Sequence, residues 1–107
     1  MNRVLVIAAH PAETAQLPPE ADVAVTGIGM SRAAALTARA VLERAPSPEQ
    51  RRDLVVVNLG SCGGLQPGLS GIFEPSVVLN RDVDAELLRA MGSEPDDRIP
   101  LAELGQV

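Results

Sequence analysis

The chain has 107 residues, a net charge of −5 and 46% hydrophobic residues, which suits one small domain with a buried core. The acidic balance argues against nucleic acid and anionic membrane surfaces as partners, because both attract basic surfaces. The single cysteine, Cys62, excludes an intrachain disulfide and a cysteine-based zinc site, and no segment approaches transmembrane length. We therefore expect a cytoplasmic protein that binds no metal and needs no cofactor.

The first predicted elements are two short strands separated by a proline-containing turn. The apolar run at residues 3–9 predicts a buried strand, which leads directly into His10 and Pro11. Proline keeps the residue before it out of helical dihedrals and suits the first position of a helix, so a short helix containing Glu13 is expected. Residues 22–26 predict the second strand.

A helix is predicted after the turn Gly27-Ile28-Gly29, with Ser31 as its N-cap and its end near Arg44. Four apolar residues recur at helical spacing and predict the face that packs on the sheet: Ala33, Leu36, Ala40 and Val41. The polar residues 49–53 are expected to form a connector.

The third predicted strand, Leu54 to Val57, is an unbroken aliphatic run, which is typical of a strand buried on both faces. A glycine-rich loop follows it directly, from Gly60 to Gly64. Glycine lets the backbone approach a ligand closely, and the Ser61 hydroxyl adds a polar group for an anion or a sugar hydroxyl. A plain turn that binds no ligand is the alternative.

The last third of the sequence predicts less regular structure. Residues 77–79 predict a short fourth strand, which is an edge or bulged strand because Pro75 precedes it, and residues 85–91 predict a helix. From Gly92 the sequence is acidic and contains proline, so irregular structure is expected. The fold class is α/β, a mainly parallel sheet with flanking helices that looks incomplete.

Ligands of open α/β sheets bind beyond the carboxyl ends of the parallel strands. Three loops meet there, and they bring Glu13, Ile28 and the segment Ser61-Cys62-Gly63 into one candidate site. The Glu13 carboxylate is a candidate general base for a water molecule, with a solvated or helix-capping role as the alternative. His10 is the only histidine, and without a second ligand nearby it is interpreted as a loop residue.

Two further motifs have alternative interpretations. Gly27-Ile28-Gly29 before a helix is part of a dinucleotide-binding fingerprint, but the next glycine or alanine is displaced and no acidic residue ends the following strand. A glycine turn that packs the helix on the sheet is therefore the favoured interpretation. The charged segment Arg81-Asp82-Val83-Asp84 offers too few oxygen ligands for a divalent cation, so a local Arg–Asp network or a subunit contact is expected.

Three segments together resemble the nucleoside phosphorylase/nucleosidase superfamily, which includes purine nucleoside phosphorylases, methylthioadenosine/S-adenosylhomocysteine nucleosidases and futalosine hydrolases. VLVIAAHPAE (4–13) is similar to the family's first strand and acidic loop. VAVTGIGMSRAAALTARAVL (23–42) is similar to its Gly-x-Gly strand-to-helix unit, and VVVNLGSCGGL (55–65) to its Gly-Ser-x-Gly-Gly loop. The charged segment 81–84 is a weaker similarity in the corresponding place.

The resemblance implies a role for each matching residue. Glu13 is similar to the carboxylate that holds the attacking water in the nucleosidases, and Ile28 would lie near the 5′ end of the substrate. Ser61, Cys62 and Gly63 would line the ribose, anion or base region. Phosphorylases with a similar glycine-rich loop usually carry a phosphate-binding arginine in the first loop, which here reads HPAET. The resemblance therefore favours hydrolysis of a purine-type N-glycosidic bond over phosphorolysis.

The resemblance covers residues 1–84, the N-terminal half of a nucleosidase-like domain, and leaves residues 85–107 as an acidic tail. In the family, the downstream half supplies the base-stacking aromatic residue, the acid that binds the ribose hydroxyls and the Asp that protonates the leaving base. We therefore expect a truncated chain of low activity alone, either a homo-oligomer or completed by a second chain. A partner- or nucleoside-binding protein without catalysis is the alternative.

Overall fold

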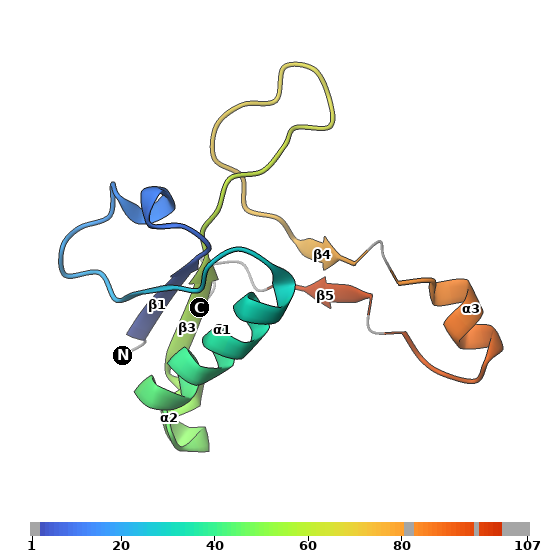
Figure 1. The fold of residues 1–107 in the computed structure, drawn as a ribbon, viewed down its shortest axis with the longest axis horizontal. Helices are drawn as coiled ribbons and strands as arrows, with labels where there is room; N and C mark the ends of the chain where they lie inside the picture. Colours follow the sequence, from blue (N-terminus) through green and yellow to red (C-terminus); the bar gives the residue numbers. More distant parts are fainter. Residues whose placement is uncertain (1–2, 81–82, 96, 102–107) are drawn as a thin grey trace. The chain divides into compact units, whose positions relative to one another are not determined.

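A computed structural model of the chain describes residues 3–80, 83–95 and 97–101. Its contacts divide the chain into two units, with the boundary in the sequence between Gly64 and Leu65. The first unit contains all of the parallel sheet, and the second contains a small antiparallel sheet and one helix (Figure 1). The α/β class predicted from the sequence is confirmed, and the two-unit division falls before the predicted boundary at residue 84.

The first unit is a three-stranded parallel sheet with strand order β2-β1-β3. In chain order its elements are β1 (Arg3–Ala8), the 3-10 helix η1 (Pro11–Thr14), β2 (Val23–Val25), α1 (Met30–Arg44), α2 (Pro48–Arg52) and β3 (Leu54–Asn58). The predicted strands and the long helix are confirmed to within two residues at their ends. The chain crosses from β2 through α1 and α2 to the far side of β1, because parallel strands of one sheet require a crossover connection.

The hydrophobic core of this unit lies between β1 and α1. Leu5 and Ile7 of β1 and Ala40 of α1 form its buried centre, and Val41 and Leu54 pack against that centre. The helix face predicted from the apolar spacing is confirmed. Small alanine side chains on α1 let the helix approach the sheet closely, and they favour helix formation at the same time.

One predicted helix cap in this unit was wrong, and one helix was not predicted. Helix α1 begins at Met30 with Gly29 as its N-cap, and no side chain caps it, so Ser31 is already inside the helix. Residues Pro48–Arg52 form helix α2 within the predicted polar connector. Ser47 caps this helix in a reciprocal arrangement with Gln50, with proline in the first turn, and these local signals outweigh the polar composition.

Strand β3 is not buried on both faces, in contrast to the prediction. Its burial is intermediate at best, and the Val56 side chain is 42% exposed. Strand β1 is the one with four successive buried residues, Leu5 to Ala8, because it lies between β2 and β3. The same kind of aliphatic sequence therefore gives a central strand in one place and an edge strand in the other.

The second unit contains β4 (Val77–Leu79), α3 (Ala85–Ala90) and β5 (Arg98–Pro100). Strands β4 and β5 pair antiparallel in a sheet of their own, so the predicted fourth strand exists but does not join the parallel sheet in the described residues. The predicted helix is confirmed, and Asp84 caps it by accepting a hydrogen bond from the Leu87 N–H at 3.0 Å. Strand β5 lies in the segment that was predicted to be irregular.

Candidate functional site

Three loops follow the carboxyl ends of the parallel strands in the first unit. The loop after β1 forms η1, the turn Gly27-Ile28-Gly29 follows β2, and the glycine-rich loop from Gly60 to Gly64 follows β3. The sequence predicts that residues of these loops converge. The structure shows that two of the five predicted residues lie together, because the Glu13 side chain contacts both the main chain and the side chain of Ser61.

The Glu13 carboxylate links the first loop to the third. Its Oε2 accepts a hydrogen bond from the Ser61 N–H at 2.8 Å and makes a longer contact with the Ser61 Oγ at 3.4 Å. Its Oε1 accepts from the His10 N–H at 3.1 Å, which completes a capping box on η1. Gly60 lies directly beneath, and a Cβ added there would be 3.2 Å from the Glu13 Oε2. One carboxylate thus joins two segments that are 48 residues apart in sequence.

These contacts lower the pKa of Glu13 below its ordinary value. The main cause is the hydrogen bond from the Ser61 main chain, and main-chain hydrogen bonds from His10 and Ala9 lower the pKa further. Desolvation of the carboxylate acts in the opposite direction, but it is smaller than the effect of the Ser61 hydrogen bond. The Glu13 side chain is therefore ionised at neutral pH. An ionised carboxylate only accepts hydrogen bonds, and several of its acceptor positions are occupied by the two loops.

The His10 side chain has a structural role at the start of η1. Its Nδ1 accepts a hydrogen bond from the Ala12 N–H at 3.1 Å, and its backbone is extended, as the following Pro11 predicts. Because Nδ1 is an acceptor, the proton of the neutral ring lies on Nε2. The interpretation of His10 as a loop residue agrees with this capping geometry, and the helix predicted at Pro11 is confirmed.

The other predicted site residues are exposed and are not held by the same contacts. The Ile28 side chain is 78% exposed in the turn before α1. Cys62 is a free, exposed thiol, and a Cβ added at Gly63 would meet no atom within 4 Å. Arg81 and Asp82 of the charged segment lie outside the described residues.

Gly27 has a structural reason to be glycine. Its φ is +82°, and a Cβ added there would be 2.7 Å from the Nε of Arg32, which donates to the Thr26 carbonyl at 3.2 Å. Arg32 thus closes over the turn that connects β2 to α1. This supports the glycine-turn interpretation of Gly27-Ile28-Gly29, since the space above the first glycine is taken by a side chain of the same chain.

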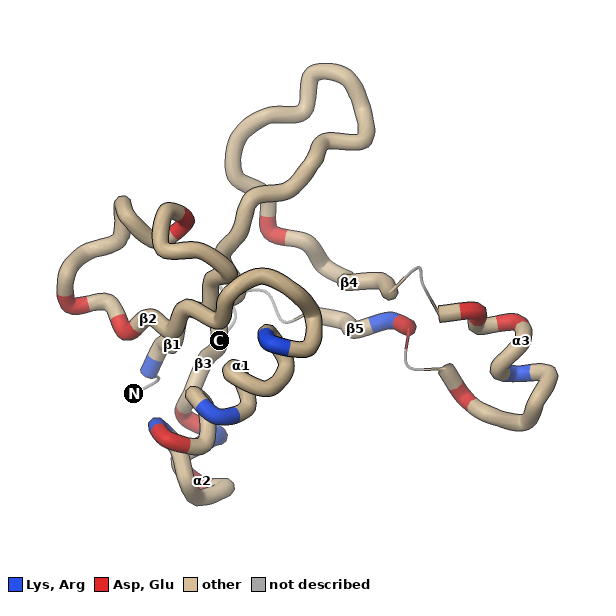
Figure 2. The backbone as a smooth tube through the Cα atoms, in the orientation of Figure 1, with Lys and Arg blue, Asp and Glu red and all other residues tan. Residues whose placement is uncertain are grey.

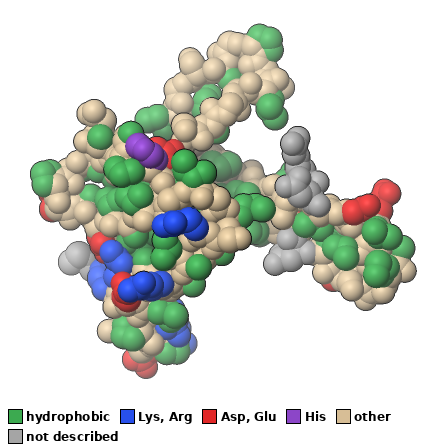
Figure 3. All heavy atoms as spheres, viewed as in Figure 1, with side chains coloured by type: hydrophobic (Ala, Val, Ile, Leu, Met, Phe, Trp, Pro, Cys, Tyr) green, Lys and Arg blue, Asp and Glu red, His purple; other side chains and the backbone are tan. Residues whose placement is uncertain are grey.

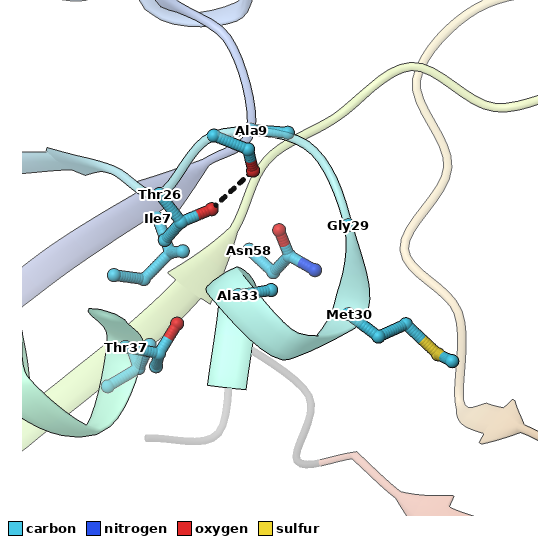
Figure 4. Close-up of a pocket in the computed structure, with 10 residues that line it drawn as sticks. Ile7, Ala9, Thr26, Gly29, Met30, Ala33, Thr37 and Asn58 are labelled. Atoms are coloured by element: carbon cyan, nitrogen blue, oxygen red, sulfur yellow. Dashed lines mark hydrogen bonds between the residues drawn. The ribbon is translucent and has the colours of Figure 1, made fainter. Parts of the chain in front are cut away.

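A groove of about 400 Å³ lies beside the N-terminal half of α1, over β1 and β3 (Figure 4). Its surface is mostly apolar, and the polar exceptions are the side chains of Thr26, Thr37 and Asn58. The Thr26 hydroxyl is buried and donates to the Gly27 carbonyl at 3.0 Å. The Asn58 carboxamide points into the groove (Figure 4).

None of the five predicted site residues lines this groove, so the sequence-based prediction missed it. Asn58 was detectable in principle, because it is the polar residue that ends an otherwise aliphatic strand at the carboxyl edge of the sheet. The helix side of the groove was not detectable, because it depends on how far α1 extends across the strands.

Among the residues that the structure describes, no group of three or more His, Cys, Asp or Glu side chains is placed to hold a metal ion. In the same residues, no helix has both the length and the apolar character needed to span a bilayer. No protein-family model matches the chain, and neither does any curated protein or solved structure.

Proposed function

We propose that this chain contributes part of a nucleosidase site, which hydrolyses a purine-type N-glycosidic bond. The observation that supports the proposal best is the ionised Glu13 carboxylate at the carboxyl edge of the parallel sheet, attached to the glycine-rich loop through Ser61. Ligand sites of open α/β sheets lie at this edge. The similarity of the three sequence segments to nucleosidases supplies the substrate class.

The proposed reaction adds water to the anomeric carbon of the ribose while the bond to the base nitrogen breaks. Glu13 accepts a hydrogen bond from the water. This hydrogen bond replaces the long 3.4 Å contact between the Glu13 Oε2 and the Ser61 hydroxyl. One proton of the water passes by way of Glu13 to the solvent, and the departing base gains one from a separate proton donor, so the products are the free sugar, with its 5′ substituent, and the neutral base. Glu13 is already ionised, so it orients the water from the start of the reaction.

The resemblance assigns the proton donor for the base to a part of the family fold beyond residues 1–84. We therefore propose that turnover by these 107 residues alone is low and rises when a second polypeptide supplies that donor. Acid assistance is worth about 10²- to 10⁴-fold in rate. It acts on the bond-breaking step, so its loss slows cleavage but still permits the nucleoside to bind.

Binding and cleavage are measured separately to test this proposal. Methylthioadenosine and futalosine are titrated into the labelled protein while the amide signals of residues 60–63 are followed, and base release is measured by chromatography. We expect shifts in these amides and slow release of base, which Glu13→Gln reduces at least about tenfold. Glu20→Gln is the matched control, since Glu20 is an exposed carboxylate of the same connection between β1 and β2.

Each contrary outcome has a distinct meaning. Unchanged amide signals with both nucleosides would contradict the proposal. Fast turnover by the chain alone would contradict the claim that its proton donor lies elsewhere. Release of the sugar as its 1-phosphate in phosphate buffer would identify phosphorolysis, the other activity in the same superfamily.

A second candidate function is binding of a partner or nucleoside without cleavage. The second unit favours it, because large apolar side chains there are almost completely exposed, including Leu65 at 97% and Ile72 at 99%. Figure 3 also shows hydrophobic side chains gathered over α3, where Leu87 and Met91 are exposed. Exposed apolar surface of this extent marks interaction sites. Saturable amide shifts without any base release would favour this candidate.

A further inference from the structure

We propose that the free edge of β3 is a self-association surface, on which the β3 strand of a second copy of this chain pairs antiparallel about Val56. This inference does not depend on the proposed function. It rests on the main-chain groups at that edge, on the absence of charge along it, and on the two-fold match of its three outward-facing residues.

The hydrogen bonds to β1 show which main-chain groups of β3 are free. The Asp53 carbonyl accepts from the Arg3 N–H at 2.7 Å, and the Leu59 N–H donates to the Ile7 carbonyl at 2.9 Å, so both residues face β1. Main-chain groups of successive strand residues point alternately to the two sides. Those of Leu54, Val56 and Asn58 therefore point away from β1, to the edge where the described sheet ends.

The edge of β3 lacks the features that protect natural sheet edges from pairing. Strand β3 is LVVVN, without charge, proline or glycine, and the groove beside it contains no charged side chain. The opposite edge differs. Strand β2 has only three residues, and Arg39, Glu43 and Arg44 of α1 line the groove beside it. Figure 2 shows that charged residues occur along α1. Short edge strands and nearby charges discourage pairing, so β3 is the edge open to another strand.

The pattern of free groups matches a second copy of β3 as the partner. In antiparallel pairing, residues that face each other with free N–H and C=O groups exchange two hydrogen bonds. A two-fold axis at Val56 pairs that residue with its own copy, and it pairs Leu54 with Asn58 of the second copy in both directions. The three outward-facing residues thus all find partners, whereas a shift by one residue would align them with inward-facing groups.

The charges near β3 are compatible with this two-fold arrangement. Asp53 falls opposite Leu59 of the second copy, and Arg52 falls opposite Gly60, so no two charged side chains face each other although each copy carries a net charge of −5. The pairing also brings the two Val56 side chains together on the groove side of the sheet. Each is 42% exposed in the single chain, and a directly opposed pair of β-branched residues stabilises a sheet.

The first experiment measures mass by sedimentation over a range of concentration up to the millimolar. The full chain is expected to pass from 11.2 kDa towards twice that mass. Val56→Lys places two ammonium groups opposite each other and should weaken dimerisation at least about tenfold. Val25→Lys is the matched control, because Val25 is 43% exposed on the other edge of the same sheet, and it should change the dissociation constant less than about twofold.

A charge-swap mixture separates loss of pairing from loss of folding. Val56→Glu should also be monomeric alone, but an equimolar mixture of Val56→Lys and Val56→Glu should form the heterodimer, because opposite charges then meet across the two-fold axis. In the wild type, amide exchange at Val56 should slow with rising protein concentration, while exchange at Val57, which faces β1, should not.

Three results would overturn the proposal. One is a wild-type chain that stays at 11.2 kDa throughout the concentration range. Another is equal weakening by Val56→Lys and Val25→Lys, which would point to net charge and not to the β3 edge. The third is a dimer whose Val56 amide exchanges at the same rate as in the monomer, since the copies would then associate through another surface.

Discussion

The Glu13 carboxylate accepts hydrogen bonds from main-chain donors of two loops. These donors stabilise the ionised form, and the sign of the pKa shift follows from that. The contact with Ser61 is present while Glu13 is ionised and weakens as the pH falls through its lowered pKa. These contacts are compatible with two roles of Glu13: a purely structural link between the loops, and the proposed orientation of a water molecule.

Replacement of Gly60, which lies next to this carboxylate, should raise the pKa of Glu13. In Gly60→Ala the added Cβ lies 3.2 Å from the Glu13 Oε2 and pushes it from the Ser61 N–H, so the pKa of Glu13 should rise towards its ordinary value. The measurement is the pH titration of the Ser61 amide signal by NMR. Gly63→Ala is the matched control, because its Cβ would meet nothing within 4 Å, and an equal shift in both variants would contradict the explanation.

The crossover from β2 to β3 is held by an ion pair at the C-terminal end of α1. Arg44 donates from Nε to Asp22 Oδ2 at 2.7 Å and from Nη2 to Asp22 Oδ1 at 2.9 Å. Asp22 immediately precedes β2, so the bidentate pair fixes the helix end to the sheet. The hydrogen bonds from Arg44 lower the pKa of Asp22, and the same bonds raise the pKa of Arg44.

Loss of this ion pair should make the protein less stable in a pH-dependent way. The Asp22 pKa is lower in the folded chain, so its contribution is complete above the unfolded value, near pH 4, and is lost as the pH falls through the folded value. Asp22→Asn should cost about 0.5–1 kcal/mol at pH 7, since the carboxylate is partly exposed, and less at pH 2, where more of the carboxylate is protonated. Urea unfolding at both pH values measures this.

The exposed pair of Arg39 and Glu43 on the same helix is the comparison for that experiment. Glu43→Gln removes a single hydrogen bond of 2.8 Å between side chains that are both well exposed. It should cost about 0.3–0.5 kcal/mol at most. A loss for Asp22→Asn that is the same at pH 2 and pH 7 would show that the ion pair is not the cause.

The two units of the chain differ in how much of each is buried in a hydrophobic core. The first has a buried core between β1 and α1, whereas the second has a two-stranded sheet and no buried residue in α3 or β5. A two-stranded sheet is marginally stable without further packing. The units should therefore open separately, and the second should open at a lower free energy.

Amide hydrogen exchange at low protein concentration tests this difference. The Leu59 and Thr26 amides of the parallel sheet donate at 2.9 Å, and the Asn80 amide, between β4 and β5, donates at 2.8 Å. Despite these similar distances, the Asn80 amide should exchange at least about a hundredfold faster. Equal protection in both sheets would show that the chain unfolds as one unit.

Much of the first unit was predictable because its signals are local. Proline after His10 and the alanine-rich spacing of α1 define those elements within a few residues of sequence, and the aliphatic runs define β1 and β3. The missed helix α2 also had a local signal, the Ser47 and Gln50 capping box with Pro48 between them. The contact of Glu13 with Ser61 followed from one general rule, that parallel strands end at the same edge of a sheet.

The remaining features depend on which strands become neighbours, and no local pattern contains that choice. Strands β1 and β3 have similar aliphatic sequences, yet β1 is central and buried while β3 is an edge with Val56 half-exposed. The pairing of β4 with β5 and the groove at Asn58 have the same origin. Composition and periodicity state how apolar a segment is, but burial is a property of its neighbours, and these are set by packing between residues distant in sequence.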